Sequence, residues 1–275
     1  MKSPRHWAHA TKHRTPPARD PHDGADNTAP DAASGPGDRL LIYGIHAVEA
    51  VLANPQRTID RVLLTENAER RLVTALTQRG IQAQRATPRE LDKRLGPDTV
   101  HQGALVETQF LDEPTLDTLC RRAKPGHPLL VLDQVTDPHN VGAILRSAAV
   151  FGASGLIMTR RHSPPLTGVL AKTASGALEL VPVAFVPNLA RALVEIGEHG
   201  LTRLGLDGEG TESIEQTNLT GPAALVLGSE GSGLRRLTRE HCDALVRIGS
   251  AGGLASLNVS NAAAVALYVA SRARQ

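Results

Sequence analysis

The pattern of apolar and polar residues changes sharply near residue 38. Residues 1–37 contain no Leu, Ile, Val or Phe, but they include six Pro and four His. Such a segment cannot bury enough apolar surface to offset the entropy lost on ordering. We therefore predict a disordered, basic and Pro-rich tail over residues 1–37, followed by folded structure from Arg39 onward.

Short apolar runs alternate with amphipathic segments over residues 38–112, which predicts a small α/β unit of about seventy residues. The expected strands are 40–45, 59–64, 81–85 and 101–108, and the expected helices are 46–53 and 68–79. In the second helix, Leu72, Val73 and Leu76 are expected to share one face. Residues 87–90, Thr-Pro-Arg-Glu, predict a capping box with Pro at the first helical position.

Residues 113–128 have the composition of a linker around a short helix, and a second α/β unit is expected over 129–275. Apolar runs such as LLVLD, GLIMT and ALVLG are typical of a mainly parallel sheet that is covered on both faces. In such sheets, ligands bind beyond the carboxyl ends of the strands. The expected strands are 129–133, 155–159, 180–186, 201–206, 223–227 and 244–248, and the expected helices are 138–152, 166–174, 188–199, 234–241 and 259–273.

Composition and charge limit the possible partners. Hydrophobic residues make up 41% of the chain and charged residues 21%, which is ordinary for a globular protein with a sizeable core. Only six residues are aromatic, which argues against a fold that stacks bases on rows of aromatic side chains. The net charge is +2, yet residues 1–19 hold five basic residues and no acidic one, so the remainder carries −3. The basic arm either contacts a polyanion such as RNA or only solubilises the chain.

The two cysteines, Cys120 and Cys242, lie far apart and form no CxxC pair, so we expect neither a disulfide scaffold nor a zinc site. This usage fits a reducing, cytoplasmic compartment. The basic N-terminus lacks the apolar stretch of a signal peptide. The uncharged segment 248–271 has a first half rich in Gly, Ser and Asn, so we expect no membrane span.

The first segment with candidate chemistry is 133–148, which follows an expected strand. Asp137 can cap the next helix, and Pro138 can occupy its first position. Arg146 is expected to need an anionic partner, because an unpaired buried charge is costly; an Arg–carboxylate pair that only fixes packing is the alternative. Asn140 and Arg146 are about 240° apart on an ideal helix, so they converge only if Asn140 lies in the loop or the first turn.

The second segment, LVLGSEGSGL at 225–234, is rich in glycine, which lets backbone amides approach a ligand closely. Its spacing matches neither a Walker loop nor a dinucleotide-binding fingerprint. Glu230 could hold a ligand or pair with Arg146, or the segment could be only a tight turn. In the third segment, 248–262, Ser256, Asn258 and Ser260 alternate before a helix, although capping requires one such residue.

Taken together, the three segments resemble the motifs of the SpoU/TrmH family of SPOUT methyltransferases, which transfer methyl from S-adenosylmethionine to a ribose 2′-hydroxyl of RNA. DPHNVGAILRSA, LVLGSEGSGL and IGSAGGLASLNVSNAAAVALY are similar to motifs 1, 2 and 3 in order and spacing, and KTASGALE at 172–179 is similar to the middle segment. Residues 38–112 resemble the L30e-like RNA-binding domain, with LLIYGIHAVEAVL and HQGALVE at its entry and exit. Within the family, the chain is most similar to bacterial members that methylate a guanosine of 23S ribosomal RNA.

The resemblance implies a catalytic domain with a C-terminal trefoil knot, which binds S-adenosylmethionine and requires no metal. It also implies a homodimer with composite active sites, acting on 23S ribosomal RNA or a pre-ribosomal particle. By match to the motifs, the backbone around Gly228, Ile248 and Leu257 would line the cofactor pocket. The catalytic surroundings would comprise Asn140, Arg146, Glu230, Ser256, Asn258 and Ser260.

The resemblance casts Arg146 as the base that takes the hydroxyl proton. A guanidinium normally stays protonated, so stabilisation of the developing alkoxide, with a grip on a neighbouring phosphate, is the role we favour. Asn140 would orient the ribose or Arg146, and Glu230 would orient Arg146 or other polar parts of the site. The alternatives are an enzyme acting on tRNA or another rRNA nucleotide, and a catalytically silent RNA-binding or ribosome-assembly factor.

Overall fold

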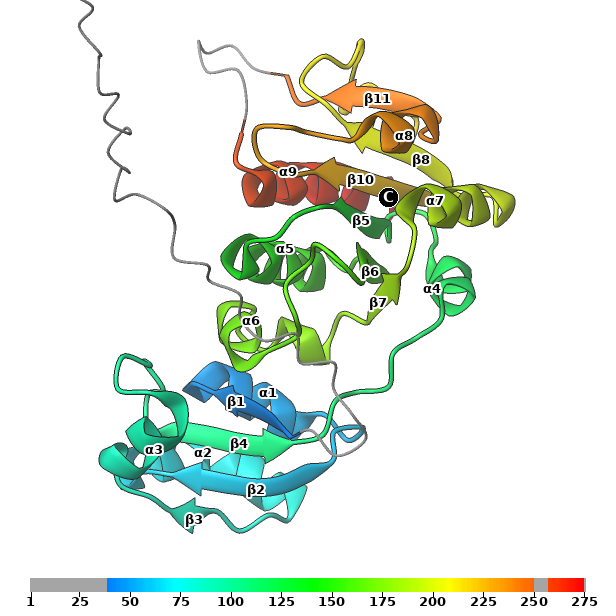
Figure 1. Cartoon of the computed structure of the whole chain (residues 1–275). Helices are drawn as coiled ribbons and strands as arrows, with labels where there is room; N and C mark the ends of the chain where they lie inside the picture. Colours follow the sequence, from blue (N-terminus) through cyan, green and yellow to red (C-terminus); the bar gives the residue numbers. More distant parts are fainter. Residues whose placement is uncertain (1–38, 250–256, 275) are drawn as a thin grey trace, which may run out of the picture. The chain divides into compact units, whose positions relative to one another are not determined.

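The computed structural model describes residues 39–249 and 257–274 (Figure 1). The tail expected at 1–37 and the candidate Ser256 therefore lie outside the described residues. So does the segment 250–256 between the last strand and the last helix, and the expected knot stays a prediction. None of the helices in the described ranges is long and apolar enough to cross a membrane.

The N-terminal sheet has the order β1-β4-β2-β3, in which β4 runs antiparallel to both of its neighbours. Apolar residues of these strands pack against α1 and α2 in the main core, which explains the alternating apolar pattern. The bounds are β1 Leu40–Tyr43, α1 Ile45–Ala53, β2 Ile59–Leu64, α2 Glu66–Arg79, β3 Gln84–Arg85, α3 Pro88–Leu95 and β4 Ala104–Thr108.

Several details of this region differ from the sequence prediction. Strand β1 ends at Tyr43 instead of residue 45, and β3 spans only Gln84–Arg85 of the expected 81–85. Val73 is 55% exposed, because the buried face of α2 consists of Ala68, Leu72 and Leu76, which are spaced four residues apart. Strand β4 begins three residues later than predicted, because Gln102 has a φ of 54°, and left-handed backbone cannot continue a strand. The capping box at residues 87–90 is confirmed.

The C-terminal sheet has the order β7-β6-β5-β10-β8-β11-β9, and its neighbouring strands are parallel, as predicted. The two-residue strand β9 at the edge of the sheet was not predicted. The bounds are β5 Leu129–Asp133, β6 Gly155–Thr159, β7 Val183–Val186, β8 Thr202–Leu206, β9 Glu212–Ser213, β10 Ala223–Gly228 and β11 Ala244–Arg247.

Helices cover both faces of this sheet (Figure 1). Leu130 and Leu132 of β5 pack in one core with α5 and α9, whereas Leu129 and Val131 pack in another core with α4 and α7. The bounds are α4 Leu116–Arg122, α5 Pro138–Phe151, α6 Gly168–Thr173, α7 Leu189–Glu198, α8 Arg236–Glu240 and α9 Val259–Ser271, with 3-10 helices η1 Ala177–Glu179 and η2 Arg272–Arg274.

The register of the central strands positions the candidate site. Gly228, the last residue of β10, pairs with Asp133, the last residue of β5, so the segments that follow the two strands start side by side. The buried Asp133 carboxylate accepts hydrogen bonds from the Arg235 backbone N–H (3.0 Å) and from Arg235 Nε (2.7 Å). These bonds close the segment after β10 back onto the end of β5.

A buried ion pair connects the segment after α1 with η1. The Arg57 and Glu179 side chains are each 3% exposed, and Arg57 Nη2 lies 2.6 Å from Glu179 Oε1. Asn54 Nδ2 also donates to Glu179 Oε2 at 2.7 Å, and Arg57 Nη1 donates to the Gln109 carbonyl at 2.8 Å. The pair therefore has partners on all sides, as a buried charge requires.

Candidate functional site

The segment after β10 is a tight turn that displays Glu230. Gly233 donates its backbone N–H to the Ser229 carbonyl at 2.9 Å, and Gly231 and Gly233 have φ values of 82° and 64°. A Cβ on Gly228 would lie 2.1 Å from the carbonyl carbon of Gly233, so the turn folds back onto a position that only glycine can occupy. The turn predicted as an alternative is present, and it leaves Glu230 exposed at its tip.

The start of α5 places Asn140 where the sequence argument required it. The Asp137 carboxylate accepts the backbone N–H of His139 at 2.9 Å, and Pro138 occupies the first helical position. Both features of the predicted N-terminus are thus confirmed. Asn140 lies in the first turn of α5, which follows the carboxyl end of β5.

Asn258 is the N-cap of α9 and is oriented by Ser260. Asn258 Oδ1 accepts the Ser260 backbone N–H at 2.9 Å and the Ser260 hydroxyl at 2.5 Å. Because two donors meet this oxygen, the amide nitrogen of Asn258 points the other way. Asn258 Nδ2 donates to Asn140 Oδ1 at 3.0 Å and to Glu230 Oε1.

Residues from the three motif segments thus form one hydrogen-bonded cluster, which we name the Asn–Glu–Asn cluster: Asn140, Glu230 and Asn258. Asn140 Nδ2 donates to Glu230 Oε1 at 3.2 Å, which closes the triangle. Two amides hold one carboxylate oxygen, while Glu230 is exposed. The cluster can therefore accept hydrogen bonds from a ligand hydroxyl and donate others through its amides.

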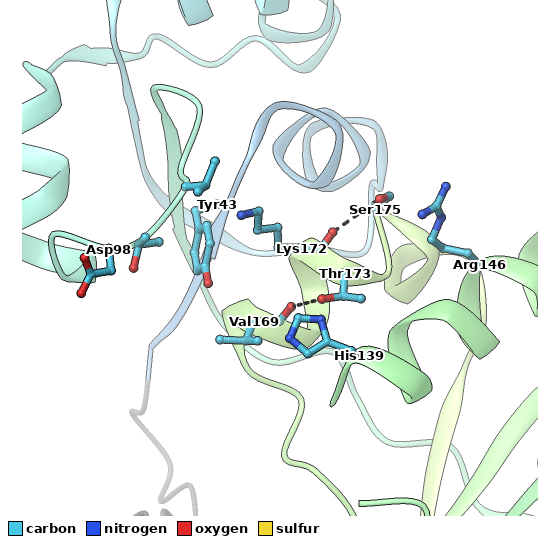
Figure 2. Close-up of a pocket in the computed structure, with 10 residues that line it drawn as sticks. Tyr43, Asp98, His139, Arg146, Val169, Lys172, Thr173 and Ser175 are labelled. Carbon is cyan, nitrogen blue, oxygen red and sulfur yellow. Dashed lines mark hydrogen bonds between the residues drawn. The ribbon is translucent and has the colours of Figure 1, made fainter. Parts of the chain in front are cut away.

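Arg146 differs from the prediction. Its side chain is exposed, so it escapes the desolvation that would demand a buried anionic partner. Among the ion pairs of the described residues, none involves Arg146, and Glu230 binds the two asparagines instead. Arg146 lies along a groove that also contains Tyr43 and Lys172 (Figure 2).

Two of the three residues expected near the cofactor lie at the carboxyl ends of strands, and the third precedes helix α9. Gly228 ends β10, Ile248 follows β11 and packs partly buried against the main core, and Leu257 precedes the cap of α9 with 52% of its surface exposed. Gly231 and Gly233 of the neighbouring turn face open space, because a Cβ added to either would meet no atom within 4 Å. Backbone groups and apolar side chains are therefore available there for an aromatic ligand.

Sequence reasoning assigned no role to Asp133 or Arg235, although the structure makes them the base of the turn that carries Glu230. A buried acid at the end of an apolar strand was the available signal, since Asp is almost never fully buried without a partner. In the described ranges, no group of three or more His, Cys, Asp or Glu side chains is arranged to hold a metal ion.

The two thiols are Cys120 in α4, which is buried, and Cys242 after α8, which is partly buried. Both are free, and burial raises the pKa of Cys120 to about 11 and that of Cys242 to about 12. A thiol with such a pKa is protonated at neutral pH and is a poor nucleophile. The chemistry of the site is therefore carried by hydrogen bonds and charge rather than by a thiolate.

Comparison with known families matches two regions of the chain. Residues 127–268 match the SpoU rRNA Methylase family, and residues 41–114 match the family described as RNA 2′-O ribose methyltransferase substrate binding. The two matches cover the two sheets separately.

Relatives and solved structures agree with these matches. The chain is 43% identical over 241 residues to the 23S rRNA (guanosine-2′-O-)-methyltransferase RlmB of Pseudomonas putida, covering 85% of this chain and 96% of the relative. It is 45% identical to RlmB of Pasteurella multocida, covering 85% and 98%. The SpoU methyltransferase AviRb of Streptomyces viridochromogenes, solved in complex with AdoMet, shares the fold with a TM-score of 0.71 at 24% identity, covering 86% of this chain and 90% of that one.

Proposed function

Because the chain belongs to the SpoU rRNA methylase family, we propose that it methylates the ribose 2′-hydroxyl of a guanosine in 23S ribosomal RNA. Relatives that are 42% to 45% identical over nearly their whole length carry that activity in their names. The observation that carries the proposal is the Asn–Glu–Asn cluster. Three segments that separately resemble family motifs meet there in one hydrogen-bonded site.

The methyl donor is S-adenosylmethionine, which supplies an electrophilic methyl group on a sulfonium when bound. The described residues at the carboxyl edge fit such a ligand. The backbone at Gly228, the partly buried Ile248 and the half-exposed Leu257 offer amide groups and apolar contact for an adenine ring. These three residues bind the cofactor, and the cluster stands beside them because Gly228 pairs with the residue that starts the Asn140 segment.

The catalytic residues act by positioning and by charge. The ribose hydroxyl is a weak nucleophile and has to be held in line with the methyl group. Glu230 and Asn140 bind and orient the ribose, and Ser260 fixes the amide of Asn258. The Arg146 guanidinium stabilises the alkoxide that develops as the hydroxyl proton passes to water. Ser256, which lies outside the described residues, belongs to the same proposed set.

The protein is a homodimer in this proposal. Val150 of α5 is 76% exposed and Tyr268 of α9 is 52% exposed, and the Tyr268 ring contacts Phe151 edge to face with centroids 6.0 Å apart. A second copy would cover this apolar surface, because these side chains are exposed on helices whose other apolar residues are buried in the main core. A monomeric mass by light scattering at micromolar concentration would refute the dimer.

We also propose that Arg146 of one protomer completes the Asn–Glu–Asn cluster of the other, since no hydrogen bond links Arg146 to that cluster within the described residues. A mixture of Arg146→Ala and Glu230→Ala chains should then regain up to about one quarter of the wild-type activity, because only mixed dimers contain one intact composite site. A mixture that stays as inactive as the separate variants would show that each protomer supplies its whole site.

The remaining assignments follow the same division of the chain. Residues 38–112 bind the RNA substrate, 113–128 link the two units, and 129–275 form the catalytic domain. The substrate is 23S RNA, either free or in a pre-ribosomal particle. The reaction takes place in the cytoplasm, where this RNA is made and assembled.

The test uses labelled S-adenosylmethionine with 23S rRNA, 16S rRNA and bulk tRNA. We expect label in 23S rRNA only, at one guanosine whose 3′ phosphodiester resists alkaline cleavage, because the methylated 2′-oxygen can no longer attack it. The Glu230→Ala chain serves as the control for contaminating enzymes. Label in tRNA alone would show that the substrate is tRNA and not 23S rRNA. RNA binding without any methyl transfer would show that the protein is a catalytically silent binding factor.

A further inference from the structure

A groove of about 470 Å³ lies between the N-terminal sheet and helices α5 and α6 (Figure 2). Tyr43 at the end of β1 and the loop at 98–100 form one wall, and His139 and Arg146 of α5 and Lys172 of α6 lie on the other. His139 directly precedes Asn140 of the Asn–Glu–Asn cluster, so α5 contributes residues to both the groove and the cluster. Its volume is that of a small-ligand site, which admits one or two nucleotides but not a duplex.

The groove carries positive charge without a matching counter-charge. Lys172 and Arg146 both line it, and neither takes part in the ion pairs of the described residues. Asp98 is the one carboxylate among the residues that line the groove, and it stands on the opposite wall. Two cations in a concave surface attract an anion, and they favour one whose charges are spaced along a chain.

Lys172 is held in place before any ligand arrives. Its ammonium lies 5.7 Å from the centroid of the Tyr43 ring, which is a cation–π contact. Tyr43 is buried, so the ring acts as a fixed platform for the lysine. The side chain of Lys172 is half-buried, and its stem packs while its charged end faces the groove.

The backbone around Lys172 is also fixed. At one end of α6, a Cβ on Gly168 would lie 2.2 Å from the Leu41 carbonyl oxygen, so the helix packs directly on β1. After its other end, Ser175 and Gly176 turn the chain with φ values of 48° and 90°, and a Cβ on Gly176 would lie 2.5 Å from Ala50 Cβ. The buried Arg57–Glu179 pair then holds the following turn. A rigid wall places Lys172 at a defined position.

The walls also offer apolar contact. Val100 is 64% exposed and Val169 is 44% exposed, and both line the groove. Apolar side chains beside two cations suit a nucleotide, whose base is flat and whose phosphate is anionic. An acidic peptide would match the cations but would leave both valines in contact with carboxylate chains.

We propose that this groove binds the single-stranded RNA segment adjoining the methylated nucleotide, with Lys172 contacting a backbone phosphate and Tyr43 holding Lys172 in position. The inference rests on the proposed function. A ribose 2′-hydroxyl has to leave its helical surroundings to reach the cluster, and unpaired RNA is the form that such sites recognise. Lys172 is therefore a substrate-binding residue, and Tyr43 is a positioning residue.

The experiment compares Lys172→Gln with Lys124→Gln, which removes an exposed lysine that also has no ion pair within the described residues. For each full-length chain we would measure the Kd for a 23S rRNA fragment over a range of salt concentrations, the kcat and KM for methyl transfer, the Kd for S-adenosylmethionine and the Tm. Lys172→Arg, which keeps the charge, tests for rescue.

Lys172→Gln should raise the KM and the Kd for RNA about ten-fold, as expected for one charge-assisted hydrogen bond. The salt slope should fall by about 0.7, the value for one phosphate contact on a single strand. The kcat, cofactor affinity and Tm should stay near those of the Lys124→Gln control, and Lys172→Arg should recover most of the RNA affinity. Tyr43→Phe, which retains the ring, should bind RNA normally, whereas Tyr43→Leu should behave like Lys172→Gln.

Unchanged RNA affinity and salt slope in Lys172→Gln, with an active wild-type chain, would overturn the groove proposal and leave the proposed function standing. Failure of the wild-type chain to methylate any RNA would overturn the proposed function. The binding measurements need no methyl transfer, so they would still decide between a groove that binds RNA and one that does not.

Discussion

Two clusters in this molecule place a glutamate against asparagine, and they differ mainly in exposure. Glu230 accepts hydrogen bonds from Asn140 and Asn258 at the surface of the carboxyl edge. Glu179 accepts from Asn54 and Arg57, and its side chain is 3% exposed. Water can replace any lost partner at Glu230 but not at Glu179. The exposed cluster is therefore available for chemistry, while the buried one serves stability.

The charged groups of this fold differ in the same way. Among the described residues, no buried side-chain polar atom lacks a hydrogen-bond partner. Charge that is taken out of water, as at Glu179 and Asp133, is fully paired. Charge left unpaired, as at Arg146 and Lys172, lies where a ligand can reach it. Burial with full pairing therefore marks the charges that serve stability here.

Arg57→Ala is expected to have the largest effect on stability. It leaves the Glu179 carboxylate buried without its cation, which costs about 3–5 kcal/mol in unfolding free energy. Urea denaturation would measure the loss. Arg70→Ala is the matched control, because its pair with Glu66 is exposed and should contribute less than about 0.5 kcal/mol. Equal losses in the two variants would contradict the distinction drawn from burial.

Arg146→Lys is expected to reduce turnover by roughly 10²–10³-fold, by analogy with loss of one donor to a developing oxyanion. The charge remains, but the planar fork that holds an oxygen in two parallel bonds is lost. Single-turnover kinetics would be paired with calorimetric titration of S-adenosylmethionine and with a melting curve. Cofactor affinity and Tm should be unchanged. Near-wild-type turnover would reject the catalytic role, and a joint fall of Tm and activity would favour a structural one.

Asp243→Asn should have a smaller, pH-dependent effect, because this pair is intermediate in exposure. Arg203 donates to Asp243 from its backbone N–H (2.7 Å) and from Nε (2.9 Å), and the side chains are 20% and 41% exposed. The hydrogen bond from the Arg203 side chain lowers the pKa of Asp243 below its usual 3.8. The contribution of the Arg203–Asp243 pair to the free energy of unfolding is therefore present above the usual Asp pKa of 3.8, and it is lost as the pH falls through the lower pKa of the folded state.

At neutral pH we expect Asp243→Asn to lose about 1 kcal/mol of unfolding free energy, and at an acidic pH below the ordinary Asp pKa of 3.8 its difference from the wild type should be smaller. Urea denaturation at both values would measure this. Asp117→Asn is the comparison, because the Asp117–Arg121 pair is exposed and should matter less at either pH. A difference in unfolding free energy between Asp243→Asn and the wild type that does not change with pH would mean that the asparagine disturbs packing rather than charge.

Removal of residues 1–37 should have the smallest effect on the fold, since no Leu, Ile, Val or Phe is lost. If the basic arm contacts RNA, the salt slope of binding should fall by roughly 0.7–0.9 per lost phosphate contact. Filter binding at several salt concentrations, with a Tm measurement beside it, would check both statements. Equal RNA affinity and equal salt slope with and without residues 1–37 would show that the arm does not contact RNA.

The parallel sheet could be predicted from sequence because β5, β6 and most of β10 are buried on both faces, which leaves uninterrupted apolar runs. The start of α5 was predictable for a local reason: Asp137 and Pro138 act within one turn. That Asn140, Glu230 and Asn258 belong to one site was implied by the resemblance of their three segments to the family motifs. The hydrogen bonds among them are confirmed geometry, while their catalytic roles remain predictions.

The misses share a physical cause, which is that they depend on contacts between distant residues. Arg57 and Glu179 are 122 positions apart, and nothing local marks them as partners. The apolar neighbours of Arg146 suggested burial, but its side chain points from α5 toward a groove instead. The edge strand β9 has only two residues and pairs only with β11 among the described strands, so no apolar pattern in the sequence predicts it.

The order in which the Asn–Glu–Asn cluster assembles has a consequence for protein synthesis. Asn258 follows Asn140 by 118 positions and Glu230 by 28, and it is the last of the three to be made. At about 5–20 residues per second, roughly 6–24 s separate the first member from the last. Meanwhile, the N-terminal sheet is already complete at Thr108. If residues 38–112 bind RNA as proposed, a chain interrupted between these points would carry the RNA-binding region without a complete Asn–Glu–Asn cluster, and it would compete with the finished enzyme for RNA.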